Sequence, residues 1–230
     1  MHLGSILKNQ RFYWSHQNFT ISVMYGIIFL CVSLVVNFFA GTYATFIASN
    51  SVQDILLDFL PRLNVEIVFV QGIVLLFFLV LVILFYKPEA IPFVLKSLAL
   101  FVFIRSFFII LTHLAPFTEY QISSNNSIVN KFTFGGDLFF SAHTGIPFLM
   151  ALIFWGDHYL RVIFVLLSLL FAAAVLFGHL HYSIDVFAAF FITYTIFHVA
   201  AILFAKDFKR LDLPNSWFLR FSSRLFSKNI

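Results

Sequence analysis

The chain has 230 residues, of which 61% are hydrophobic and only 10% are charged. Because globular domains carry about a quarter charged residues, this composition excludes a water-soluble single domain. A bilayer crossing takes about 20 apolar residues, so the length fits about six crossings with no separate soluble domain. The formal net charge is +4, and the lone cysteine, Cys31, excludes an intrachain disulfide and a multi-cysteine zinc site.

The apolar runs predict an all-α fold, a polytopic membrane bundle of six transmembrane helices. Residues 1–19 form an N-terminal segment without the features of a removable signal peptide. A six-span domain follows over residues 20–205, and a basic tail occupies residues 206–230. Each apolar run is long enough to cross the hydrocarbon core as a helix. The six runs are residues 20–48, 65–86, 91–114, 138–155, 161–178 and 183–205.

The distribution of basic residues predicts the orientation. With six spans, both termini share a side, and that side holds eleven of the fourteen Lys and Arg residues. The opposite side holds Arg62 and Lys131, and Arg105 lies within a span. We therefore expect both termini in the cytoplasm. The basic tail is then a positive-inside anchor that also attracts anionic headgroups, and it needs no nucleic-acid partner.

Several ionisable groups gather near the non-cytoplasmic ends of the spans. They are His113, His143, His179, His181 and Asp185. Ionisable residues within a span are costly unless they are paired or hydrated, so their convergence at one depth predicts a functional site. For His113 or His179 alone, a histidine that simply bonds a nearby carbonyl is the favoured alternative.

The fourth predicted span opens on a segment suited to holding an anion. Two glycines and Asp137 precede Ser141 and Thr144, whose hydroxyls flank His143. Free amides at such a helix start can hold an anion. An aspartate that only caps the helix is the structural alternative.

A second segment supplies a histidine with a carboxylate. His181 stands four residues before Asp185, so on a helix the two lie one turn apart. Such a carboxylate orients the ring and stabilises its cation. Two histidines from different helices, one backed by Asp, can divide nucleophile and general-acid duties in an attack on phosphorus. This chemistry needs no metal, and we expect no cofactor.

Both segments resemble those of a known family, the sphingomyelin synthases. Residues 136–144 read GDLFFSAHT, which is similar to the family's G-D-x-x-x-S-G-H-T motif. Residues 179–186 read HLHYSIDV, which is similar to its H-x-H-Y-T-x-D-V motif. These synthases belong to the type 2 phosphatidic acid phosphatase superfamily, whose members use two histidines and an Asp as a triad. The resemblance thus implies His143, His181 and Asp185 as catalytic residues.

Weaker similarities extend the resemblance over about residues 51–200. The family's P-L-P-D-x-x-x-D loop is similar to the stretch from Asp54 to Asp58, and its R-x(6)-T-x-L-P-x-P segment to the stretch that begins at Arg105. Glu66 corresponds to an acidic residue at the start of the following span. The chain departs from the family at Ala142, where glycine is usual. The resemblance implies a substrate-binding set of Asp137, Ser141, Thr144, Arg105, Glu66 and His179.

The basic residues favour a phosphodiester substrate. Lipid phosphatases of the superfamily bind a monoester through a K-x(6)-R-P motif and an Arg six residues before the second histidine. This chain has no Arg-Pro dipeptide, and Val175 occupies the second position. A monoester carries up to about two negative charges near neutral pH and needs matching cations, whereas a diester carries one. For a diester, Arg105 and the hydroxyls of Ser141 and Thr144 then supply enough positive charge and hydrogen-bond donors.

These features predict an integral membrane phosphotransferase with its active site toward the non-cytoplasmic leaflet. The resemblance implies that it moves a phospho-headgroup from a phospholipid donor to a lipid alcohol such as ceramide, and we expect this to proceed through a phosphohistidine on His181. Asp54, Asp58 and Asp137 are candidates for holding a cationic headgroup, and solvated loop acids are the alternative. A lipid phosphatase or phospholipase C-type hydrolase is the main alternative function. A transporter pathway and a hydrolase that uses Ser141 are weaker ones.

Overall fold

The computed structural model describes residues 3–111, 114–115 and 138–211. Within these ranges every regular element is a helix, which confirms the predicted all-α fold. Five helices are long and apolar enough to cross a bilayer, as expected for an integral membrane protein. They are α2 (Gln17–Phe46), η1 with α4 (Ile67–Tyr86), η2 with α5 (Pro88–Ile109), α8 (His158–Phe177) and α9 (Ser183–Leu203). The apolar helix α7 (Ala142–Ile153) is shorter.

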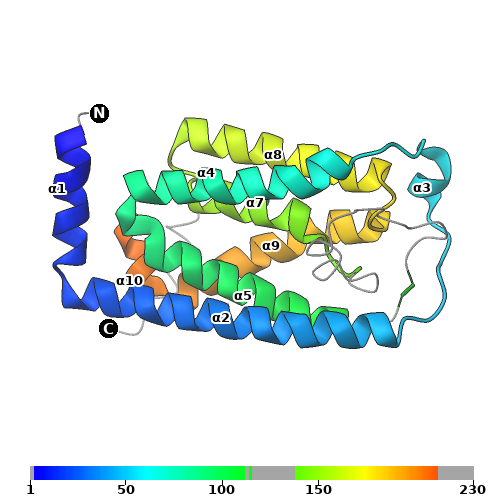
Figure 1. Cartoon of the computed structure of the whole chain (residues 1–230), viewed down its shortest axis with the longest axis horizontal. Coiled ribbons are helices and arrows are strands. Elements are labelled where there is room, and N and C mark those ends of the chain that lie inside the picture. The colour runs from blue at the N-terminus through cyan, green and yellow to red at the C-terminus, as the bar shows by residue number, and fades with distance from the viewer. Residues whose placement is uncertain (1–2, 112–113, 116–137, 212–230) are drawn as a thin grey trace, which may run out of the picture.

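Short helices join the long ones or cap the ends of the bundle. They are α1 (Leu3–Trp14), α3 (Ile55–Phe59), the π-helix η1 (Ile67–Gln71) before α4 (Gly72–Tyr86), η2 (Pro88–Ala90) before α5 (Ile91–Ile109), α10 (Ala205–Phe208) and η3 (Lys209–Leu211). The long helices run side by side, with α2 packed along α5 (Figure 1). Helix α1 stands across the end of the bundle that also holds α10, and α3 lies at the opposite end.

Helix α7 forms the centre of the bundle, where it packs on α8 and α9. Nine of its twelve residues are buried. Twelve residues rise about 18 Å, which is less than a hydrocarbon core of about 30 Å. The predicted span over residues 138–155 is therefore helical only from Ala142 to Ile153. Leu138, Phe140 and Ser141 precede the helix but are already buried, and protein cover permits non-helical backbone at such a depth.

A glycine allows the neighbouring helices to close onto α7. A Cβ atom on Gly145 would lie 2.7 Å from two ring atoms of Phe101 and 2.8 Å from the Thr193 hydroxyl oxygen. Phe101 belongs to α5 and Thr193 to α9. Gly145 is therefore a point of close approach between α5, α7 and α9.

A buried carboxylate ties the helices together at the end that holds α1. Asp207 is 4% exposed, and its carboxylate accepts hydrogen bonds from Lys96 Nζ at 2.6 Å and Arg210 Nη1 at 2.8 Å. The Ser22 hydroxyl also donates to it, at 2.8 Å. Because these partners come from α2, α5 and η3, one carboxylate joins three elements and neutralises buried positive charge.

Candidate active site

The site lies at the end of the bundle where α9 begins, and its first component is the pair His181 and Asp185. His181 Nδ1 lies 3.5 Å from Asp185 Oδ2 and 3.3 Å from the carbonyl oxygen of Leu138. A carbonyl only accepts, so Nδ1 carries the proton in this arrangement. In the neutral ring, Nε2 then carries the lone pair. Both side chains are buried, which makes the carboxylate an effective partner for an imidazolium.

Asp185 also fixes the first turn of α9. Its Oδ2 accepts a hydrogen bond of 3.0 Å from the backbone N–H of Tyr182, the residue that precedes the helix. The same oxygen thus caps the helix and faces the ring of His181. The two roles are compatible because a carboxylate oxygen has more than one acceptor direction.

The beginning of α7 is fastened to the beginning of α9. The backbone N–H of Ser141 donates to the carbonyl oxygen of Asp185 at 3.1 Å. Ser141 caps α7, because its hydroxyl oxygen accepts from the backbone N–H of Thr144 at 3.4 Å. Among the residues that the structure describes, the Thr144 hydroxyl is one of four buried side-chain groups with no hydrogen-bond partner. Thr144 is 0% exposed, and its role in substrate binding remains a prediction.

His143 projects from the first turn of α7 onto the π-helix η1. Its Nε2 lies 3.2 Å from the carbonyl oxygen of Phe69, and its ring stacks on the Phe69 ring with centroids 3.9 Å apart. The hydrogen bond from the Ser141 N–H to the Asp185 carbonyl oxygen holds the start of α7, which carries His143, beside the start of α9. The π-helix is a feature often found at functional sites.

Arg105 reaches the same region from α5. It is 6% exposed, and its Nε donates a 3.0 Å hydrogen bond to the carbonyl oxygen of Phe140. Phe140 has a φ of 22°, a strained conformation for a residue with a side chain. Arg105 thus supports an unusual backbone turn directly before Ser141.

The other predicted substrate-binding residues lie in different surroundings. His179 Nε2 lies 3.2 Å from the carbonyl oxygen of Leu60, a contact that joins the loop before α9 to the segment after α3. This is the carbonyl-bonding role considered for a lone histidine. Glu66 is half-buried and stands three residues before Phe69, at the start of η1. Asp137 and His113 fall outside the described residues.

Asp54 serves a structural role at this site. Its carboxylate accepts hydrogen bonds from the backbone N–H groups of Leu56 and Leu57 at 3.0 and 3.2 Å, and from that of Ser183 at 2.6 Å. Burial opposes ionisation of Asp54, but these hydrogen bonds outweigh it and hold the pKa of the carboxyl below its ordinary value. With both oxygens engaged, Asp54 is a poor candidate for holding a cationic headgroup, whereas Asp58 is exposed.

Tyr182 is a further residue that the motif alone did not single out. It is 2% exposed, its hydroxyl donates to the carbonyl oxygen of Ala115 at 2.9 Å, and it accepts from the backbone N–H of Val52 at 3.2 Å. Burial raises the pKa of this phenol. Phe69 also escaped sequence analysis, because the chain has 35 Phe residues and nothing in the sequence distinguishes this one.

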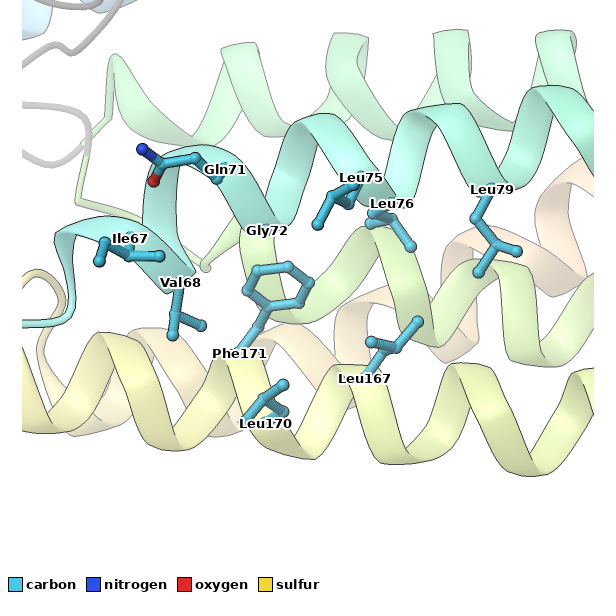
Figure 2. A pocket seen from close by; sticks show the side chains of 10 residues that line it. All are labelled: Ile67, Val68, Gln71, Gly72, Leu75, Leu76, Leu79, Leu167, Leu170 and Phe171. Carbon is cyan, nitrogen blue, oxygen red and sulfur yellow. The ribbon is translucent and has the colours of Figure 1, made fainter.

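An apolar groove lies beside the site. It has a volume of about 320 Å³ and runs between η1 with α4 on one side and α8 on the other (Figure 2). Phe171 lines it, and the ring of Phe171 lies 5.9 Å from that of His143. Within the part of the chain that the structure describes, no group of three His, Cys, Asp or Glu residues is placed to hold a metal ion.

Comparison with known proteins found one family match. Residues 135–202 match a protein-family model described as PAP2 superfamily C-terminal. This segment contains His143, His181 and Asp185. The match supports the type 2 phosphatidic acid phosphatase superfamily and, in general, an enzyme of phosphoryl transfer or hydrolysis. Searches of curated proteins and of solved structures found no match.

Proposed function

We propose that this protein is a membrane phosphotransferase that moves a phospho-headgroup from a glycerophospholipid to a lipid alcohol such as ceramide. The observation that carries the proposal is the placement of His181, whose Nδ1 faces Asp185 Oδ2 at 3.5 Å and Leu138 O at 3.3 Å. This placement leaves the Nε2 lone pair of the neutral ring for attack on phosphorus.

The first half of the reaction transfers the headgroup to the enzyme. His181 Nε2 attacks the phosphorus, and the bond from phosphorus to the glycerol oxygen breaks. His143, in its protonated form, gives a proton to that oxygen, so diacylglycerol leaves as a neutral alcohol. Asp185 stabilises the positive charge on the His181 ring of the resulting phosphohistidine.

The second half returns the headgroup to a lipid. His143, now neutral, takes the proton from the acceptor hydroxyl as its oxygen attacks phosphorus. The bond from phosphorus to His181 Nε2 breaks, and both histidines return to their starting states. If water takes the place of the lipid alcohol, the same steps give phospholipase C-type hydrolysis, which is the second candidate function.

The charge of the site supports a diester donor. A diester phosphate carries one negative charge, which the buried guanidinium of Arg105 matches, and the unpartnered Thr144 hydroxyl offers a neutral donor. A monoester carries up to about two charges and requires a second cation. We place the site at the non-cytoplasmic leaflet, since the basic residues on the side of the termini favour a cytoplasmic location for α1.

The test is a lipid-resolved assay with purified protein in vesicles. Labelled phosphatidylcholine or phosphatidylethanolamine is supplied with and without ceramide, and phosphatidic acid is supplied separately. We expect ceramide-dependent headgroup transfer and an acid-labile label on the protein that is absent from His181→Ala. Release of inorganic phosphate from phosphatidic acid as the dominant activity would refute the diester proposal, and diacylglycerol release without ceramide would favour the hydrolase.

A further inference from the structure

The groove between α4 and α8 is apolar along its length. Ten residues line it, and Gln71 is the one polar side chain among them. Figure 2 shows Ile67 and Gln71 at one end of the groove, with Leu79 and Leu167 toward the other. The first end belongs to η1, which also carries the Phe69 carbonyl that contacts His143. The groove therefore begins beside the candidate active site and runs toward the middle of the bundle.

The base of the groove is continuous with the site. Phe171 is 1% exposed, and its ring lies beneath Gly72, where an added Cβ would come within 2.9 Å of a ring carbon. The same ring lies 5.9 Å from His143. A ligand in the groove would therefore touch Phe171, which in turn contacts the ring that we propose for proton transfer.

Both walls belong to helices that expose side chains to the surrounding bilayer. Leu75 on α4 is 65% exposed and Leu170 on α8 is 52% exposed, although both line the groove. Twelve residues separate Ile67 from Leu79, which corresponds to about 18 Å along a helix. Half of a hydrocarbon core is about 15 Å thick. The groove thus matches the depth of one leaflet, and the neighbouring molecules in that leaflet are acyl chains.

From this geometry we infer that the groove holds one acyl chain of a substrate lipid and thereby positions its phosphate at His143 and His181. The inference rests on the proposed function in one respect, namely that the bound lipid is a substrate of the enzyme. The apolar lining excludes a charged ligand, because an unpaired charge buried among leucines is strongly disfavoured. Gln71 supplies a polar group near the end that faces the site.

A photoreactive lipid tests the inference without requiring turnover. Phosphatidylcholine with a diazirine in one acyl chain is mixed into vesicles that contain the full-length protein, and labelled residues are mapped by mass spectrometry. The catalytically inactive His181→Ala variant is labelled in parallel. In both proteins we expect labelling concentrated on the groove-lining residues of α4 and α8.

Two substitutions on α8 provide a matched pair. Leu170 and Leu169 are both 52% exposed, but only Leu170 lines the groove. Leu170→Trp should fill the groove and lower labelling at least fivefold, whereas Leu169→Trp should leave it unchanged. Leu170→Trp should also raise the KM for a long-chain donor and leave that for a water-soluble short-chain donor unchanged.

The outcomes separate this inference from the proposed function. The proposal that the groove binds an acyl chain would be overturned if labelling were spread evenly over all lipid-facing helices of the wild type, or if both substitutions lowered it equally. Neither result would affect the transferase assay. A second outcome is that no donor supports transfer or hydrolysis, while Leu170→Trp lowers labelling and Leu169→Trp does not. Lipid binding in the groove is then supported, and the proposed function is refuted. The wild-type map needs no substitution, so it remains decisive if a variant does not fold.

Discussion

The side chain of Asp54 accepts a 2.6 Å hydrogen bond from the backbone N–H of Ser183, 129 positions later in the chain. The same carboxylate caps α3 through the N–H groups of Leu56 and Leu57. Ser183 is the first residue of α9 and lies between His181 and Asp185 in the sequence. The loop that follows α2 is therefore fastened directly to the backbone that presents the candidate nucleophile.

We expect Asp54→Ala to lower the free energy of unfolding by about 1–3 kcal/mol at pH 7, the range for lost caps and charge-assisted hydrogen bonds. Because folding lowers the pKa of Asp54, its contribution is complete above the unfolded value of about 3.9 and is lost as the pH falls through the lower folded value. Denaturation in detergent between pH 3 and 7 measures this. Asp58→Ala is the control, since Asp58 is exposed. A wild-type-to-variant difference that stays unchanged as the pH falls below about 4 would contradict the assigned role of the carboxylate.

Asp185→Asn should lower kcat by about 10²–10⁴-fold, in the range seen when the orienting aspartate of a triad is replaced by asparagine. The asparagine oxygen can still accept from the backbone N–H of Tyr182, so α9 should remain capped and the protein folded. What is lost is the negative charge that faces His181. Steady-state kinetics measure the loss of catalytic rate, and a thermal unfolding curve shows whether stability has changed. Wild-type turnover by this variant would show that Asp185 has no part in the mechanism.

Phe69→Leu should lower kcat by about 2–10-fold, because a stacked ring pair contributes about 0.5–1.5 kcal/mol beyond its buried area. The Phe69 ring stacks on that of His143, and we expect it to position this histidine rather than to contact the substrate. The pH profile of kcat should therefore shift, since the surroundings of His143 change. Phe78→Leu, at an exposed position on α4, is the control and should leave both unchanged. Equal effects of the two substitutions would show that Phe69 has no special part in positioning.

Gly145→Ala should destabilise the protein by about 1–3 kcal/mol, the usual cost of overpacking a core. The new methyl group would meet Phe101 and Thr193 at less than 3 Å, and both come from helices that pack on α7. Gly4→Ala is the matched control, because nothing lies within 4 Å of that position. The control should be neutral or stabilising by up to about 1 kcal/mol, since alanine favours a helix over glycine. Chemical denaturation of both variants measures the contrast.

Asp207→Ala should cost about 3–5 kcal/mol, because it leaves Lys96 largely buried without its carboxylate partner. Lys96→Met should cost less, since Arg210 still pairs with Asp207. Both residues lie at the end of the bundle opposite α3, so activity per folded molecule should not change. Thermal unfolding and a specific-activity measurement test the two statements. A larger loss from Lys96→Met than from Asp207→Ala would reverse the assigned order.

Much of the fold could be predicted from the sequence. Hydrophobic runs of span length predict helices, and the structure contains five of them close to their expected positions. The predicted fourth span differed, since only Ala142–Ile153 is helical. Its apolar residues reflect burial in protein as much as contact with lipid, and composition does not distinguish the two. The motif residues His143, His181 and Asp185 were found because their chemistry is unusual within an apolar span. Their catalytic roles remain predictions.

The sequence by itself determined that this chain lies in a membrane, that it is helical, and which rare polar side chains share one end of the bundle. Those features follow from the cost of placing polar groups in hydrocarbon, which is a property of residue type and spacing. Tertiary structure alone decided that Asp54 supports α9, that Phe69 among 35 Phe residues stacks on His143, and that a groove meets the site at Phe171. These relationships depend on backbone carbonyl and amide groups and on packing between distant segments, and every residue except proline has the same backbone N–H and C=O groups whatever its side chain.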